Sequence, residues 1–125
     1  MKKEEFAEIR RVLGKTQKQM AQLLGVSIKA VQSLEQGYRN VSVNIERQVL
    51  FLMAMKKNRE GPPCWDIKKC NLSTRVNCPA WEFQIGNLCW FVNGTICCGE
   101  VHDNWHAKME YCRECEMFHA MLPQY

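Results

Sequence analysis

Cysteine is the residue type in this sequence with the most chemistry to offer, because its thiolate binds soft metal ions and reacts with oxidants. The chain has 125 residues and eight cysteines, all of which lie between Cys64 and Cys115. This density in the second half of the chain is typical of a scaffold that disulfides or metal ions stabilise. The first 63 residues contain no cysteine, so the two halves differ in kind.

The spacing of the cysteines favours an iron–sulfur cluster over a zinc site. Only Cys112 and Cys115 have the two-residue spacing of a zinc knuckle, whereas a structural zinc site commonly has two such pairs. Single, widely spaced cysteines among aromatic residues suit a cluster, since thiolates hold the irons and an apolar shell restricts water. We expect a cluster of the 4Fe–4S type, with zinc as the alternative. The tryptophans that could form this shell, or simply the core, are Trp65, Trp81, Trp90 and Trp105.

Other residues with catalytic potential form no recognisable set. His102 and His106 are four residues apart, but the glutamate of an HExxH zinc motif is missing between them, and His119 stands alone. Surface or packing roles are expected for all three histidines. The sequence has no phosphate loop, nucleophile elbow or paired carboxylates. We therefore do not expect an enzyme.

Charge divides the chain at nearly the same place as the cysteines. Residues 1–60 carry 12 Lys and Arg against 6 Asp and Glu, and residues 61–125 carry 5 against 7. A basic half suits a polyanion such as DNA. Gly61 can close the preceding helix, and the two prolines after it lack backbone N–H donors. We expect a DNA-binding domain at 1–58, a linker at 59–63 and a cysteine-rich metal domain at 64–125.

The apolar spacing in the basic half predicts four helices, at about residues 3–13, 17–24, 28–36 and 43–57. Thr16 and Ser27 are suitable N-caps for the second and third helices. Gly25 stands at the break between them, where a positive φ would suit glycine, and Gly37 should end the third helix. Two short helices around a glycine turn are typical of a helix-turn-helix.

The run TQKQMAQLLGVSIKAVQSLEQGYRN resembles the helix-turn-helix of the phage repressor and Cro type, also called XRE-like. The resemblance covers residues 3 to about 57 and implies that the helix beginning after Ser27 enters the major groove of double-stranded DNA. Ile28 departs from the polar residue often found there and offers only apolar contact, for example to a thymine methyl. The DNA-binding residues implied by position are Gln17, Ser27, Ile28, Lys29, Gln32, Ser33, Arg39 and Asn40.

The same resemblance implies an ion pair between Arg10 and Glu35, with a structural role. The expected fourth helix has an apolar stripe wider than one contact with a small bundle needs. Either it is buried on two sides, against the bundle and the cysteine-rich half, or it forms a dimer interface. A homodimer also agrees with the use of two half-sites by repressor-type modules, and we expect an inverted repeat in the DNA.

The second half resembles the cysteine-rich two-CW domain, which is appended to signalling and regulatory proteins of anaerobic bacteria. The resemblance covers about residues 64–119 and rests on CWDI, CPA, CW, GTIC and the closing K…CRECEMF. It implies a sensory accessory domain. The cysteines within its pattern, our candidate metal ligands, are Cys64, Cys70, Cys78, Cys89, Cys97, Cys112 and Cys115. Cys98 stands where a glycine is usual.

The pair Asn93-Gly94 between LCWFV and TICC predicts a two-residue β-hairpin. In that register Cys89 lies opposite Cys98 and Cys97 points to the other face, in conflict with the family pattern unless a bulge intervenes. Near the end of the chain, Trp105, Met109 and Cys112 fall on one helical stripe. Cys115 follows one turn later, so both thiols can face the core.

These patterns predict a mainly α protein: a four-helix helix-turn-helix domain, then a small irregular α+β domain with one hairpin. We expect a cytoplasmic transcriptional regulator, because the sequence has neither a signal peptide nor a membrane segment. Loss or oxidation of its iron–sulfur cluster, or a small oxidant, would change DNA binding. The alternatives are a regulator with a structural zinc site and an antitoxin or adaptor that holds a partner protein through its cysteine-rich half.

Overall fold

Four helices form the first part of the chain, and their bounds follow the caps in the sequence. They are α1 (Lys3–Leu13), α2 (Gln17–Leu24), α3 (Ile28–Gln36) and α4 (Val43–Lys56). The computed structural model describes residues 1–56, 66, 69–85, 88–97 and 99–122. It divides into two compact units, Met1–Lys56 and Lys57–Gln124. The expected linker at 59–63 lies outside the described residues, as do Cys64, Trp65 and Cys98.

Helix capping in the first unit agrees with the sequence prediction. The Thr16 hydroxyl accepts a hydrogen bond from the Gln19 backbone N–H, while the Gln19 side chain accepts one from the Thr16 N–H. This reciprocal arrangement is a capping box. Ser27 caps α3 with a single bond, its Oγ accepting from the Ala30 backbone N–H at 3.1 Å. The predicted starts of α2 and α3 are therefore confirmed.

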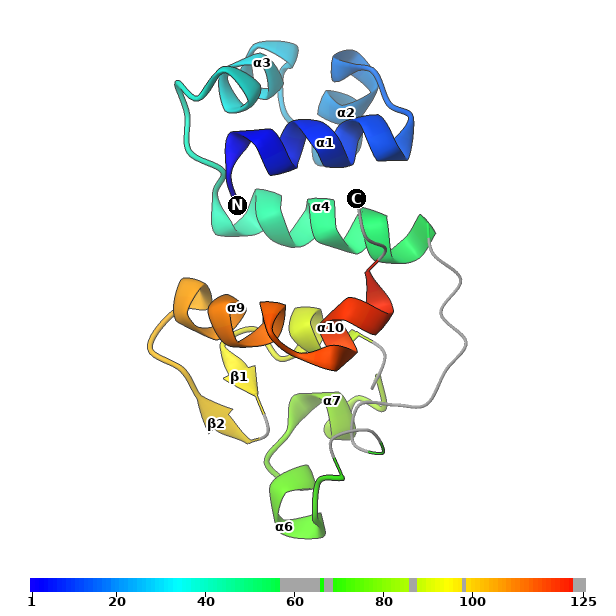
Figure 1. Ribbon diagram of the computed structural model, residues 1–125, viewed down its shortest axis with the longest axis vertical. Helices are drawn as coiled ribbons and strands as arrows, with labels where there is room; N and C mark the ends of the chain where they lie inside the picture. Colours follow the sequence, from blue (N-terminus) through cyan, green and yellow to red (C-terminus); the bar gives the residue numbers. More distant parts are fainter. Residues whose placement is uncertain (57–65, 67–68, 86–87, 98, 123–125) are drawn as a thin grey trace. The chain divides into compact units, whose positions relative to one another are not determined.

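The core of the first unit joins all four helices, because each contributes fully buried apolar side chains. Figure 1 shows α1 between the α2–α3 pair and α4. Lys56 adds a hydrogen bond between α4 and α1: its Nζ donates to the carbonyl oxygen of Val12, in the last turn of α1, at 2.7 Å. The most buried members of this core are Phe6, Ile9, Met20, Val31, Val49, Leu50, Met53 and Ala54.

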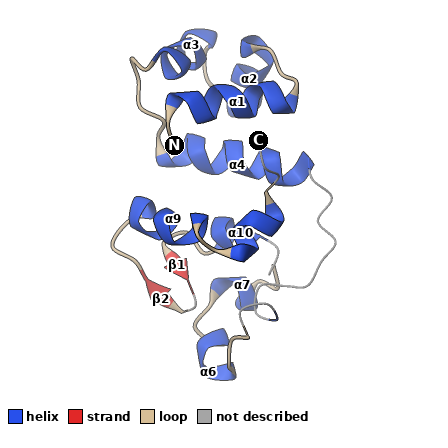
Figure 2. Cartoon of the chain, in the orientation of Figure 1, coloured by secondary structure: helices blue, strands red, loops and turns tan. Residues whose placement is uncertain are grey.

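The described residues of the second unit form short helices and one small hairpin, which Figure 2 shows. Its core holds two of the tryptophans, Trp90 and Trp105, together with Met109, Cys112 and Phe118. The predicted stripe of Trp105, Met109 and Cys112 is thus confirmed as buried. The elements are α6 (Leu72–Arg75), α7 (Pro79–Glu82), α8 (Cys89–Val92), β1 (Ile96–Cys97), β2 (Glu100–Val101), α9 (Trp105–Arg113) and α10 (Glu116–Met121).

The hairpin exists, but its predicted position is wrong. Residues Cys89–Val92 form a helix instead of a strand, and the strands pair Ile96 with Val101 and Cys97 with Glu100. The Asn93 N–H continues α8 by donating to the Cys89 carbonyl at 2.9 Å, and Gly94 follows with φ +61°. A glycine with positive φ ends a helix as readily as it turns a hairpin. The predicted pairing of Cys89 with Cys98 across strands is therefore lost.

Among the described residues the fold class is mainly helical with one two-stranded antiparallel sheet, as predicted. Within the part of the chain that the structure describes, no helix has both the length and the apolar character needed to cross a membrane.

Candidate DNA-binding face and cysteine site

The turn between α2 and α3 depends on Gly25. Its φ of +70° lies in the left-handed region, where a side chain is strained. The next residue, Val26, donates its backbone N–H to the Ala21 carbonyl at 3.0 Å, and this bond closes the end of α2. The turn thereby fixes the direction in which α3 leaves, and so sets which face of α3 is presented to solvent.

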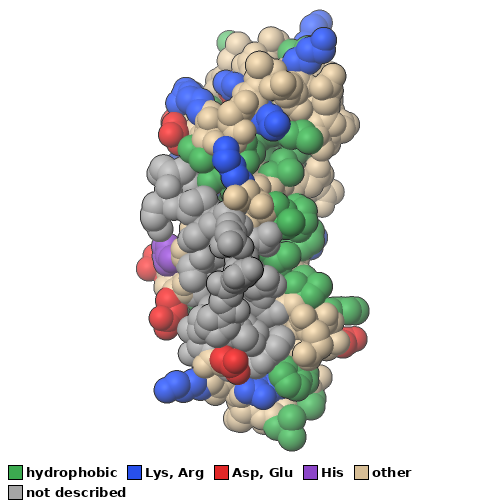
Figure 3. Space-filling view, turned by 90° about the vertical axis from the view of Figure 1, so that its right-hand side faces the viewer, with side chains coloured by type: hydrophobic (Ala, Val, Ile, Leu, Met, Phe, Trp, Pro, Cys, Tyr) green, Lys and Arg blue, Asp and Glu red, His purple; other side chains and the backbone are tan. Residues whose placement is uncertain are grey.

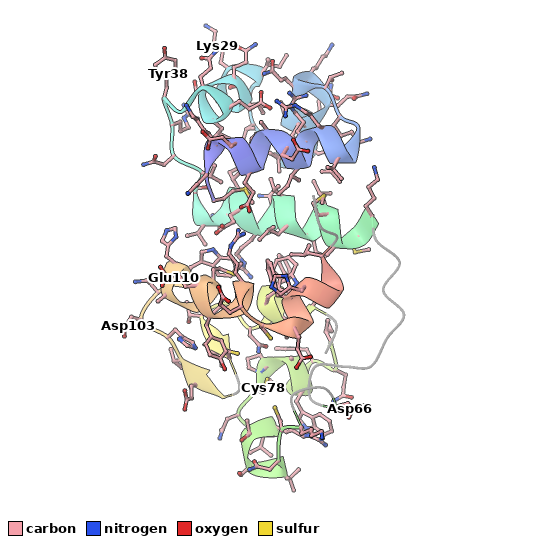
Figure 4. All side chains as sticks on the ribbon, viewed as in Figure 1. Lys29, Tyr38, Asp66, Cys78, Asp103 and Glu110 are labelled. Atoms are coloured by element: carbon pink, nitrogen blue, oxygen red, sulfur yellow. The ribbon has the colours of Figure 1, made fainter. Side chains whose placement is uncertain are left out.

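The exposed face of α3 carries the side chains predicted to read DNA bases. Lys29 is exposed and points away from α1 in Figure 4, and Ile28 is 40% exposed. Gln32 and Ser33 are half-buried on the same helix. Ser27 is exposed at the N-cap, where its Oγ accepts the cap hydrogen bond and its hydroxyl proton remains available to an acceptor. This face can offer a cation, an amide and an apolar group to a groove.

A chain of polar contacts connects this face to the interior of the first unit. The predicted ion pair is present: the Arg10 guanidinium contacts the Glu35 carboxylate, and both side chains are mostly buried. Glu35 also accepts a hydrogen bond from the Gln17 side-chain amide. The side-chain oxygen of Gln17, Oε1, in turn lies 3.5 Å from the side-chain nitrogen of Gln32, Nε2. Glu35 thus holds Gln17, and Gln17 adjoins Gln32.

This network makes Glu35 a positioning residue, and Glu35→Gln tests that role. Neutralising the carboxylate leaves the Arg10 charge without its partner, and we expect a loss of about 1–3 kcal/mol in the free energy of unfolding. Denaturant titration measures this loss. Arg11→Ala, which removes an exposed pair with Glu8 (3.0 Å), is the control and should cost less than about 0.5 kcal/mol. Equal effects of the two substitutions would contradict the network.

The loop after α3 adds a basic cavity that the sequence reasoning missed. Tyr38, Arg39 and Asn40 are exposed there, and Tyr38 projects outward in Figure 4. A cavity of about 410 Å³ beside this loop is lined by Arg39 and Asn40 and also by Lys2 and Lys3 at the start of the chain. On the face drawn in Figure 3, Lys and Arg side chains are spread over the first unit. The cluster of basic residues at the first positions was the available sequence signal.

The six described cysteines are half-buried or buried, and none is in a disulfide. Cys112 is 5% exposed on α9, and Cys115 stands at the N-cap of α10. Cys78 is the N-cap residue of α7, and its Sγ lies 3.4 Å from the side-chain nitrogen of Asn93. Figure 4 labels Cys78. The remaining three are Cys70, which precedes α6, Cys89 on α8 and Cys97 on β1.

Lys108 is a buried lysine that interacts electrostatically with several of these cysteines. Its side chain is 1% exposed, and its Nζ donates to the Trp90 carbonyl. Burial lowers the pKa of Lys108 from its ordinary value, while the thiols of Cys112, Cys89 and Cys97 act in the opposite direction and Cys112 also hydrogen-bonds to it. Three predicted ligands therefore lie within electrostatic reach of one ammonium group. The sequence reasoning assigned no role to this lysine, although it belongs to the closing motif.

The sulfur atoms of the described cysteines are chemically suited to bind a soft metal ion or an iron–sulfur cluster. Around them, the Trp90 indole nitrogen and the Asn93 amide oxygen are buried without a hydrogen-bond partner among the described residues. In the described ranges, however, no three His, Cys, Asp or Glu side chains are arranged to hold a metal ion. The candidate ligand Cys64 lies outside those ranges. His102 packs against the Tyr111 ring at 5.7 Å between centroids, whereas His106 and His119 are exposed.

Comparison with known proteins bears on the first unit alone. Searches of curated proteins and of solved structures give no significant match to the chain. Residues 6–45 match a helix-turn-helix family model, a range that begins in α1 and ends in α4 and so contains the whole α2–turn–α3 segment. This match supports a DNA-binding helix-turn-helix, of the kind found in transcriptional regulators, in this part of the chain.

Proposed function

We propose that the chain is a sequence-specific transcriptional regulator. It binds double-stranded DNA with α3 in the major groove, and its cysteine-rich unit senses redox state or a small oxidant through an iron–sulfur cluster. The observation that carries the DNA-binding part is the outward face of α3. Lys29 and Ile28 are exposed on this face. Gln32 lies on the same helix, with its side chain beside that of Gln17. Glutamine suits adenine, and lysine suits guanine or a phosphate.

Contacts to phosphates come from two places in this proposal. Gln17 lies at the first position of α2, and Arg39 and Asn40 lie in the loop after α3. Lys2 and Lys3 line the same cavity as Arg39 and Asn40, which makes it a suitable site for one backbone phosphate. The cavity therefore extends the phosphate contacts beyond those implied by the family resemblance.

Substitutions on α3 separate base reading from phosphate binding. Lys29→Ala and Gln32→Ala should each weaken binding to a selected operator by about 1–3 kcal/mol and relax preference at one or two base pairs. Arg39→Ala should weaken all sequences alike. The measurement is fluorescence anisotropy on operators enriched from a random DNA library, with Arg11→Ala as the matched cation control. Unchanged affinity and preference in Gln32→Ala would contradict this docking.

Salt dependence tests the cavity. Each phosphate contact contributes about one unit to the slope of log affinity against log salt concentration. Lys2→Ala and Lys3→Ala should each reduce that slope by about 1 without changing base preference. Binding to the selected operator and to a scrambled duplex over a range of salt concentrations measures it. An unchanged slope in both variants would show that the cavity does not bind a phosphate of the DNA.

The cysteine-rich unit is proposed to hold the cluster through thiolates. The candidates within reach of Lys108 are Cys89, Cys97 and Cys112, and the wider set includes Cys64, Cys70, Cys78 and Cys115. When bound, a cluster supplies one-electron chemistry and reactivity toward oxygen or nitric oxide. Anaerobic purification followed by iron, sulfide and zinc analysis tests this part. If the protein contains zinc and no iron, the unit has a structural zinc site in place of a redox-sensing cluster. If it contains neither metal, the alternative of a partner-binding module is favoured.

We also propose a homodimer, because one α3 reads one half-site and an inverted repeat needs two. The fourth helix is the proposed route between sensing and DNA binding. Its apolar surface extends from buried Leu50 and Met53 to Met55, which is 52% exposed. A change in the cysteine-rich unit would alter the dimer geometry through this helix. Sedimentation of the intact protein, with its metal bound and removed, measures the oligomeric state.

A further inference from the structure

The side-chain amides of Gln17 and Gln32 have a fixed polarity in the structure. Their anchor is the Glu35 carboxylate, which only accepts hydrogen bonds: the Arg10 guanidinium contacts its Oε1, and the Gln17 Nε2 donates to its Oε2. Arg10 is itself held, because its Nη1 donates to the Lys15 carbonyl oxygen at 2.9 Å. The carboxylate is therefore fixed on both sides, and it faces Gln17 with an oxygen.

A carboxylate determines which end of a neighbouring amide faces it. The reverse orientation of Gln17 would place its carbonyl oxygen against an oxygen of Glu35, two acceptors with no proton between them. The Nε2 of Gln17 must therefore face Glu35, and its Oε1 is left for the next glutamine. This Oε1 lies 3.5 Å from the Nε2 of Gln32. An acceptor again faces a donor, so the polarity that Glu35 imposes on Gln17 is passed on to Gln32.

Gln32 can then present only one set of groups to a base. Its Nε2 carries two hydrogens, of which one is directed to Gln17, so its carbonyl oxygen and one N–H remain. Adenine offers the matching pair in the major groove, the N6 amino donor and the N7 acceptor, whereas guanine offers two acceptors, N7 and O6. Ile28, one turn earlier on the same helix, has no polar group that could compete for Gln17.

We infer that the relay from Glu35 through Gln17 makes Gln32 selective for adenine and against guanine. Gln17 and Glu35 are positioning residues in this scheme, because neither touches the base. The inference rests on the proposed function, in which Gln32 reads a base pair, and it adds the groups that set which base is read. The second N–H of Gln17 remains available to a phosphate, so the relay is compatible with its proposed phosphate contact.

Two operators that differ at one base pair test the relay in the full-length protein. This base pair is the position whose preference is lost in Gln32→Ala, and it is made A·T in one operator and G·C in the other. Fluorescence anisotropy at one salt concentration should show that the wild type binds the adenine operator at least about tenfold more tightly. Gln17→Met keeps the length of the side chain and removes both ends of the amide, so this ratio should fall to about threefold or less. The control, Gln22→Met, makes the same change at an exposed position of α2 and should keep the wild-type ratio.

The ratio separates the relay from a phosphate contact, because loss of a phosphate contact weakens binding to both operators alike. If Gln17→Met weakens binding to both operators equally and keeps the wild-type ratio, the inference is wrong and the proposed function stands. If Gln32→Ala has no effect on preference at any base pair, the proposed docking is wrong and the inference fails with it.

A second readout uses the protein without DNA. In two-dimensional nitrogen–proton NMR spectra, Gln17→Met and Glu35→Gln should each shift the side-chain amide signal of Gln32, and Gln22→Met should not. An unshifted Gln32 signal in both relay variants would overturn the inference whatever the DNA affinities. If Gln17→Met does not fold, Glu35→Gln provides the same comparison, because its amide can face Gln17 with either end and the ratio should again fall.

Discussion

Removal of the proposed metal from the intact chain is expected to unfold the cysteine-rich unit and leave the first unit helical. The second unit has helices of only four residues at α6, α7 and α8 and strands of two residues. Elements this short do not persist without tertiary support. Its described apolar core is small, so bound metal should supply much of its folding free energy. The first unit has four helices around a shared core and no cysteine.

Hydrogen exchange resolved by peptide measures this difference. After treatment with a chelator or air, amides in α9 and its neighbours should lose protection, whereas those in α1 to α4 should keep theirs. Restoring the metal under anaerobic conditions should return the protection, which separates metal loss from irreversible oxidation. A metal-free protein with a fully protected second unit would argue against a structural metal of any kind.

Cys112→Ser should abolish metal binding and leave DNA affinity fixed in one state, insensitive to air or nitric oxide. Cys112 is the most buried of the described cysteines, and its backbone carbonyl accepts a hydrogen bond from the Cys115 N–H at 2.9 Å. A serine oxygen at this place is a poor ligand for soft metals. Cys115→Ser, at the other end of the same spacing, should have the same effect.

The measurement is DNA affinity at one salt concentration, before and after exposure to the oxidant. The wild type should change its affinity between the two conditions, and both serine variants should not. Cys98→Ser is the matched control, because Cys98 lies outside the cysteine pattern that the two-CW resemblance implies and should respond as the wild type does. If the wild type has the same DNA affinity and the same oligomeric state before and after exposure, the cysteine-rich unit does not sense the oxidant.

The two units differ in how far their sequences predicted them. In the first unit, the helix bounds, the Thr16 and Ser27 caps and the Gly25 turn follow from local rules, because each depends on residues a few positions apart. The ion pair between Arg10 and Glu35 spans 25 residues, yet the family resemblance predicted it. Its extension to Gln17 and Gln32 was not predicted, since it requires α2 and α3 to be placed against each other.

In the second unit, the sequence by itself determined that Trp105, Met109 and Cys112 share one helical stripe, because a periodic apolar pattern is a strong local signal; the structure shows these residues buried on α9. The Asn93-Gly94 pair was ambiguous, since a glycine with positive φ serves a helix end and a hairpin equally well. Only tertiary structure decided for the helix, where Asn93 is buried with its amide on Cys78. The burial of Lys108 was also decided by packing, because the Trp90 carbonyl that its ammonium contacts belongs to another helix and reaches it only when the unit folds.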